Sequence, residues 1–234
     1  MIKKKEKLFR LDSESLDRVG IIDIGSNSVR LVVYEGTARS PRYFYNEKIP
    51  CGLGAGMKSG GCLNTNGKQR AINAILRFSA ITKKMKLKSL VAVATAAVRE
   101  ARDGKEFAFL IEKDTGVRVQ IIPGIREAYF SACGVLLGYP KAHGIVCDIG
   151  GTSLEVAKIE TGKVSNCNSA LLGPLALASQ KTEVESYIAS NVKGLRGAFS
   201  IEYPELFLVG GCWRAIARIH MNRTNYPLKI LNGP

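Results

Sequence analysis

The chain has 234 residues, of which 46% are hydrophobic and 23% are charged, a composition typical of soluble globular proteins. No apolar run approaches the roughly 20 residues that span a bilayer, which argues against a membrane-spanning protein. Lysine and arginine outnumber aspartate and glutamate by 34 to 20, and the formal net charge of +14 favours a polyanionic partner.

The first 17 residues are basic and polar, and no apolar stretch follows Lys3–Lys7, so we expect a polar leader over residues 1–17 and no secretory signal. The cytoplasm is therefore the expected location. The six cysteines form no CxxC pair and have no zinc-site spacing, which predicts buried free thiols. The basic charge comes with no helix-turn-helix, zinc finger or aromatic RNA-binding motif, so we expect no DNA partner.

The first half of the chain alternates predicted strands and helices. Short β-branched runs bounded by glycine or polar turns predict strands at 19–25, 29–34, 42–48, 89–95 and 117–122. Apolar residues at helical spacing predict helices at 68–87, 105–113 and 125–137. Asp103 is a candidate cap for the second of these helices, and the glycine-rich segment 51–67 is expected to be a loop.

The same order of elements begins again at Gly144. Strands are predicted at 144–149, 152–159, 163–168, 205–209 and 227–231. Helices are predicted at 183–192 and 213–221. An internal repeat of this kind predicts two similar α/β lobes, 18–138 and 139–234, with a cleft between them.

Each predicted lobe opens with a strand that ends in Asp-Ile-Gly, at Asp23–Gly25 and Asp148–Gly150. A tight turn after a strand exposes backbone N–H groups, and glycine lets a phosphate oxygen approach without a Cβ clash. The candidate phosphate-binding residues of the two turns are Gly25, Ser26, Asn27, Ser28, Gly150, Gly151, Thr152 and Ser153. Because carboxylates repel phosphate, Asp23 and Asp148 are candidate ligands of a Mg²⁺ ion. One such turn is more often a structural hairpin, but a matched pair favours phosphate binding.

The segment Asp23–Val33 resembles the first phosphate motif of the exopolyphosphatase and guanosine pentaphosphate phosphohydrolase (Ppx/GppA) family. Four further segments resemble later motifs of that family in the same order: Asn46–Gly54, Ala94–Ala101, Asp148–Glu155 and Val209–Ala215. The resemblance implies a duplicated ribonuclease H-like α/β fold of the actin, hexokinase and Hsp70 ATPase type.

The resemblance also implies Mg²⁺-dependent hydrolysis of terminal phosphoanhydrides in inorganic polyphosphate or guanosine pentaphosphate. It makes Glu127 the catalytic base, Glu155 an assisting carboxylate, Arg99 a phosphate clamp, and Gly210 and Gly211 a nucleotide-binding turn. On the residues alone, the favoured interpretations are an ordinary first-turn helix acid for Glu127 and a surface arginine for Arg99. The alternative for Glu155 is a solvent-facing strand residue.

Three positions depart from the family pattern. Thr152 stands where the second phosphate motif usually has its third glycine, so its Cβ blocks a phosphate or its hydroxyl donates a hydrogen bond. Arg126 precedes Glu127 and is expected to lower the pKa of that glutamate and weaken it as a base. Ala176 replaces a basic residue.

Members of the family continue beyond the position of Pro234, so the chain resembles their N-terminal portion. We therefore expect an incomplete second lobe with one sheet face exposed, covered by a homodimer partner or by a C-terminal helical region. Two other functions stay open. One is a non-catalytic binding protein for polyphosphate or guanosine tetraphosphate, and the other is a sugar or acetate kinase of the same fold.

Overall fold

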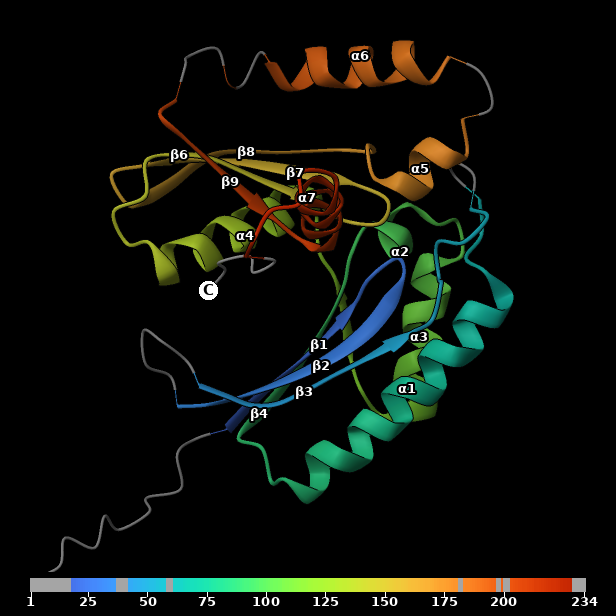
Figure 1. Cartoon of the computed structure of the whole chain (residues 1–234). Helices are drawn as coiled ribbons and strands as arrows, with labels where there is room; N and C mark the ends of the chain where they lie inside the picture. The colour runs from blue at the N-terminus through green and yellow to red at the C-terminus, as the bar shows by residue number, and fades with distance from the viewer. Residues whose placement is uncertain are drawn as a thin grey trace, which may run out of the picture.

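The computed structural model describes residues 18–36, 42–57, 61–180, 183–196, 199 and 203–228. The leader expected at residues 1–17 lies outside these residues, as does most of the strand predicted at 227–231. Pro227 and Leu228, the part of that strand that is described, are not in a strand. The described residues form two sheets and seven helices (Figure 1).

The first sheet has five strands in the order β3-β2-β1-β4-β5. β2 runs antiparallel to β1 and β3, whereas β4 runs parallel to β1 and β5. The elements of this lobe are β1 (Arg18–Ile24), β2 (Ser28–Glu35), β3 (Arg42–Pro50), α1 (Thr65–Lys84), β4 (Ser89–Ala94), α2 (Ala96–Glu100), α3 (Gly104–Thr115) and β5 (Val119–Ile121).

The core of the first lobe lies on one face of this sheet, under α1 and α3. Alternate residues of β1, Ile22 and Ile24, are fully buried there with Phe78 of α1 and Phe107 of α3. Burial of each such side chain contributes about 1.5–3 kcal/mol. Because strand side chains alternate between faces, Asp23 projects from the opposite face, toward the second lobe.

The second sheet repeats the first, in the order β8-β7-β6-β9. β6 pairs antiparallel with β7 and parallel with β9, as β1 pairs with β2 and β4. The remaining elements are α4 (Gly124–Gly138), β6 (Gly144–Ile149), β7 (Leu154–Glu160), β8 (Lys163–Ala170), α5 (Pro174–Ala178), α6 (Val184–Arg196), β9 (Glu205–Val209) and α7 (Gly211–Arg223). The predicted duplication of a ribonuclease H-like unit is therefore present.

Helix α4 follows the last strand of the first lobe but packs on the sheet of the second. Ala128, Ala132 and Val135 of α4 form a buried cluster with Val146 of β6 and Ala157 of β7. Figure 1 shows α4 between the two sheets, with α6 on the far face of the second sheet. Helices thus lie on both faces of the second sheet, and the expectation that one whole face is exposed was wrong.

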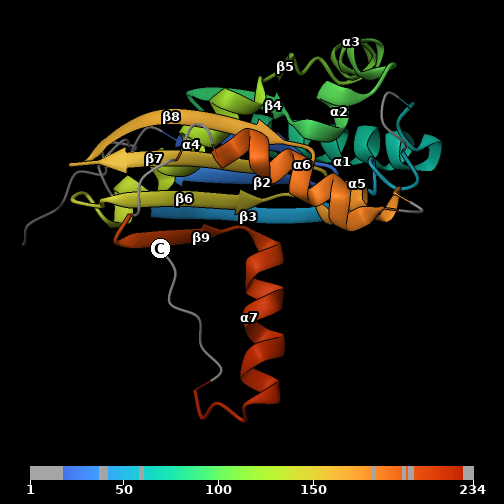
Figure 2. The same cartoon turned by 90° about the horizontal axis from the view of Figure 1, so that it is seen from above.

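What the second lobe exposes is its edge. Leu206 and Leu208 of the edge strand β9 are 62% and 49% exposed. Helix α7 leaves the end of β9 and extends away from the body of the molecule (Figure 2), with Ile216 and Ile219 also exposed. The strand β9 and the helix α7 thus both leave apolar side chains uncovered, as α4 also does at Ile125, Phe130 and Leu137.

Local details differ from the predictions for identifiable reasons. α1 begins at Thr65, earlier than predicted, because the Asn64 side chain accepts a hydrogen bond from the Gly67 N–H at 2.8 Å and caps the helix. Asp103 makes no capping bond to α3; its carboxylate accepts from Leu63 N and Lys68 Nζ instead. α2 and α5 were not predicted, since five residues are too few to show a helical period.

The cysteines are all free thiols, as predicted, but Cys51 alone is buried and Cys62 is exposed. None of the helices in the described ranges combines the length and apolar character that crossing a bilayer requires.

Candidate functional site between the two lobes

The two Asp-Ile-Gly segments form matching turns. In the first, Gly25 N donates to Ser28 O at 3.0 Å, and in the second Gly150 N donates to Ser153 O at 2.9 Å. These bonds close each turn between two antiparallel strands, with β1 and β2 flanking one and β6 and β7 the other. The same short sequence therefore produces the same turn at the start of both lobes.

Each turn also accepts a backbone hydrogen bond from the loop that follows the third strand of its lobe's sheet, β3 or β8. Gly54 N donates to Ser26 O at 2.8 Å in the first lobe, and Leu175 N donates to Gly151 O at 2.8 Å in the second. Asn27, at the tip of the first turn, is exposed, and its carbonyl accepts from Cys51 N. The carbonyl groups of the turns are thus bonded within the protein.

The two turns meet. Thr152 Oγ1 donates a hydrogen bond to Ser26 Oγ at 2.6 Å, although the residues are 126 positions apart in the chain. The two roles predicted for Thr152 toward a phosphate stay predictions; in the structure its hydroxyl bonds the opposite turn. The two aspartate-bearing turns therefore contact each other between the lobes.

Asp23 and Asp148 are the next-to-last residues of β1 and β6. Solvent still reaches Asp23, but burial among protein atoms raises the pKa of its carboxyl. Arg30 lowers that pKa and Asp148 raises it. A cation would relieve the repulsion between these two carboxylates.

Asp148 accepts a hydrogen bond on one carboxylate oxygen, and its other oxygen lies close to the backbone of Gly210. Ser131 Oγ of α4 donates to Oδ2 at 2.6 Å. A Cβ on Gly210 would lie 2.6 Å from Oδ1, and Gly210 has a φ of +100°, so glycine is required at this position. Gly210 and Gly211, the predicted nucleotide turn, thus lie beside Asp148 at the start of α7.

Arg99 connects the lobes through carboxylates. Its Nη1 donates to Glu127 Oε2 at 3.0 Å and to Ile122 O at 3.2 Å, and its Nε donates to Glu100 Oε1 at 3.0 Å. Nη2 lies 3.9 Å from Glu155 Oε1. Arg99 is therefore a largely buried cation among three acids, and the surface arginine considered from the sequence is not what the structure contains.

Glu155 is buried, at 2% exposure, on the face of β7 that α4 covers. It pairs with Asp148 of β6 on one side and Ser169 of β8 on the other, and Ser169 Oγ donates to Glu155 Oε1 at 2.8 Å. Burial, together with the charges of Glu127 and Asp148, raises the pKa of Glu155 to about 7, although hydrogen bonds from Ser153 and Ser169 oppose the rise. It is not a solvent-facing strand residue.

Glu127 lies in the first turn of α4, with Ser131 one turn further on the same helix face. Burial raises the pKa of the Glu127 carboxyl, Arg99 lowers it, and Asp23 and Asp148 raise it. The expectation that Arg126 lowers this pKa was wrong. The Arg126 guanidinium lies over the Phe130 ring, 4.9 Å from its centre, because consecutive helix residues point in different directions.

Some residues of this site were missed in the sequence. Ser131, Ser169 and Glu100 each contact a predicted site residue. Ser169 lies opposite Glu155 in the β7–β8 register, so correct strand pairing was the signal that could have found it. Gly124 is another missed position, because a Cβ there would lie 2.5 Å from Ser169 Oγ.

The donor set is limited for a metal ion. Within the described ranges, no three His, Cys, Asp or Glu side chains are grouped so that they could hold a metal. Asp23 and Asp148 fit Mg²⁺ in another way, because this ion usually binds to one or two carboxylates and completes its shell with water and substrate phosphate.

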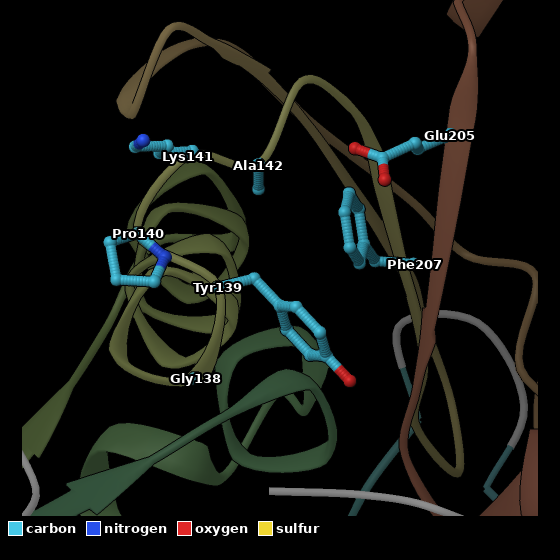
Figure 3. Close-up of a pocket in the computed structure, with 7 residues that line it drawn as sticks. All are labelled: Gly138, Tyr139, Pro140, Lys141, Ala142, Glu205 and Phe207. Atoms are coloured by element: carbon cyan, nitrogen blue, oxygen red, sulfur yellow. The ribbon is translucent and has the colours of Figure 1, made fainter.

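A hollow of about 450 Å³ lies elsewhere, lined by Gly138–Ala142, Glu205 and Phe207 (Figure 3). It adjoins the beginnings of β6 and β9, whereas Asp148 lies toward the other end of β6. Tyr139 and Phe207 approach each other across it, with ring centres 5.9 Å apart. None of the predicted site residues lines this hollow, so it is separate from the site.

The sequence matches a family model described as the Ppx/GppA phosphatase family over residues 32–234. Exopolyphosphatase 1 of Mycobacterium leprae is 31% identical over 145 residues, which cover 60% of this chain and 42% of that protein. The chain thus spans less than half the length of this curated relative.

Solved structures share the fold. An exopolyphosphatase from Cytophaga hutchinsonii superimposes with a TM-score of 0.80 at 23% identity, over 91% of this chain and 72% of the other. The PPX-GPPA enzyme of Aquifex aeolicus gives a TM-score of 0.70 at 25% identity, over 91% and 73%. The predicted actin-like, ribonuclease H-like fold is confirmed.

Proposed function

Because the chain belongs to the Ppx/GppA phosphatase family, we propose that it hydrolyses a terminal phosphoanhydride of inorganic polyphosphate or guanosine pentaphosphate. The observation that carries this proposal is the meeting of the two turns at Ser26 and Thr152, beside Asp23 and Asp148. Backbone N–H groups of both turns would bind the anion, because glycine leaves the backbone accessible there.

In this proposal Glu127 is the general base that takes a proton from the attacking water. Burial raises the pKa of its carboxyl toward the range in which a base works well near neutral pH. Arg99, 3.0 Å from Glu127, would bind the terminal phosphate with its planar fork. Glu155, next to Arg99 and held by Ser169, would assist in orienting the water.

Asp23 and Asp148 would hold Mg²⁺ together with substrate oxygens and water. When bound, this ion would neutralise charge that develops on the phosphate. In this proposal the turns bind and orient the anion, and Glu127 accepts the proton. Ser131 holds Asp148 through its hydrogen bond.

We favour polyphosphate over guanosine pentaphosphate as the substrate, because a long anion interacts with more of the +14 net charge of the chain. Gly210 and Gly211 beside Asp148 would contact a nucleoside if guanosine pentaphosphate binds. Comparing phosphate release from the two compounds on the same preparation tests this preference.

The proposal is tested by measuring phosphate release with Mg²⁺ for the parent chain and Glu127→Gln. A general base contributes about 10²–10⁴-fold, so we expect turnover to fall by that factor while polyphosphate binding persists. Binding without phosphate release in the parent chain would instead identify a non-catalytic binding protein. Undiminished turnover in Glu127→Gln would remove Glu127 from the mechanism.

A further inference from the structure

The hydrogen bond between Thr152 and Ser26 is the point at which the two lobes are joined at their turns. Its length is 2.6 Å, and the two residues are 6% and 5% exposed. A hydrogen bond shielded from water is strong, and a buried hydroxyl left without a partner is costly. This contact therefore fixes the position of one turn against the other.

Both hydroxyls are attached to backbone that is itself held. The carbonyl of Ser26 accepts from Gly54 N at 2.8 Å, and the carbonyl of Thr152 accepts from Gly173 N at 2.9 Å. The backbone that carries each hydroxyl is thus held in place by its own loop. The bond consequently couples two loops, and not merely two side chains.

The residues around the Ser26–Thr152 bond are tightly packed. A Cβ on Gly151 would lie 3.0 Å from the Cβ of Ser26 and 3.4 Å from Leu175 Cδ1. A Cβ on Gly54 would lie 3.3 Å from the same Leu175 atom and 3.4 Å from Thr152 Oγ1. Residues of both lobes are thus in close contact on either side of the bond, which sets a definite separation between the turns.

We propose that the Ser26–Thr152 bond makes these two residues determinants of specificity for anions that contain several linked phosphates. The inference rests on the proposed function, in which both turns bind the same anion. A ligand that contacts both turns binds best when their separation is already correct, because less free energy is lost in ordering them. An orthophosphate ion, which is small enough to contact one turn, does not depend on that separation.

The test is a double-mutant cycle made in the full chain carrying Glu127→Gln, so that hydrolysis does not disturb the measurement. The cycle consists of this parent, Ser26→Ala, Thr152→Val and the combination. Valine keeps the size of threonine but removes its hydroxyl. Isothermal titration calorimetry with inorganic tripolyphosphate and with orthophosphate, at fixed salt and Mg²⁺, gives the dissociation constants.

We expect each single substitution to weaken tripolyphosphate binding about tenfold, and the double substitution to weaken it no further, because one shared bond is lost in all three. Orthophosphate binding should change less than about twofold. Additive losses, or equal losses for both anions, overturn the inference. If neither anion binds the parent, the proposed function fails and the inference fails with it.

Should Thr152→Val not fold, Thr152→Ser and Thr152→Ala serve as the matched pair. Serine retains the hydroxyl and should bind tripolyphosphate like the parent, whereas alanine should show the loss. If the serine and alanine variants bind tripolyphosphate equally well, the inference is overturned.

Discussion

Arg99 Nη1 lies 3.0 Å from Glu127 Oε2, which joins the proposed phosphate clamp to the proposed base. The same guanidinium donates to Glu100 and approaches Glu155 at 3.9 Å. A phosphate that binds here competes with carboxylates for one cation. Arg99 should therefore influence both the affinity for substrate and the basicity of Glu127.

We expect Arg99→Ala to lower the rate of phosphate release by about 100-fold or more, since a positioned charge-stabilising donor is commonly worth that factor. Arg99→Lys keeps the positive charge but loses the planar fork, so its rate should be intermediate. Steady-state kinetics with polyphosphate measure both variants.

Arg126 provides the control, because its guanidinium lies over the ring of Phe130. Arg126→Ala should change the rate of phosphate release by less than about twofold, since the lost charge is not directed at the reacting groups. A large loss in Arg126→Ala, or none in Arg99→Ala, would show that the wrong arginine has been assigned.

Glu155 should make the stability of the protein depend on pH. Burial raises its pKa in the folded state to about 7 from an ordinary value of 4.5, so the fold favours the protonated carboxyl. The stabilisation is complete below about pH 4.5 and is lost as the pH rises through about 7, because the folded chain must then bury a charge. Its full size is on the order of 3 kcal/mol.

Glu155→Gln removes this titration. Relative to the parent, the free energy of unfolding of the variant should increase between pH 5 and pH 8, as measured by urea unfolding without divalent metal. Glu112→Gln, at an exposed position of α3, should show no such trend. A constant difference between Glu155→Gln and the parent across this range contradicts the prediction.

The sequence was sufficient to predict the repeat, because its signals are local. Asp23–Gly25 and Asp148–Gly150 each combine an apolar strand with a glycine turn, and strands that follow such turns pair with their neighbours. Helical spacing also predicted α4, but periodicity does not say which sheet a helix packs on. That α4 covers the second sheet depends on tertiary packing.

The contacts of the site residues were harder to predict, because they too depend on tertiary packing. Arg126 is adjacent to Glu127 in the sequence, whereas Arg99 is 28 positions away and yet makes the ion pair. The turn of a helix separates neighbouring side chains, and the fold joins distant ones. Ser131 and Ser169 carried no signal of their own, since isolated serines are common on helices and strands.

Gly210 and its neighbour Gly211 allow a matched test of backbone strain beside Asp148. Gly210→Ala should destabilise the fold by about 1–3 kcal/mol, because its φ is +100° and the new Cβ would meet Asp148 Oδ1 at 2.6 Å. Gly211→Ala has open space around the new Cβ and lies in the first turn of α7, so its stability should be equal or slightly higher. Thermal unfolding of the two variants compares them, and similar losses would refute the role of Gly210.

Ser131 should tune the proposed Mg²⁺ requirement through Asp148. Its hydroxyl donates to Asp148 Oδ2 at 2.6 Å, and outer hydrogen bonds of this kind orient a carboxylate toward a metal ion. Ser131→Ala should therefore raise the Mg²⁺ concentration for half-maximal phosphate release by about tenfold, with a smaller effect on the rate at saturating Mg²⁺. Ser131→Thr keeps a hydroxyl at the same position and should restore most of the Mg²⁺ affinity. If alanine and threonine variants have the same Mg²⁺ dependence as the parent, Asp148 does not need this bond to bind the ion, and the loss of Ser131 would then matter only for the packing of α4 on β6.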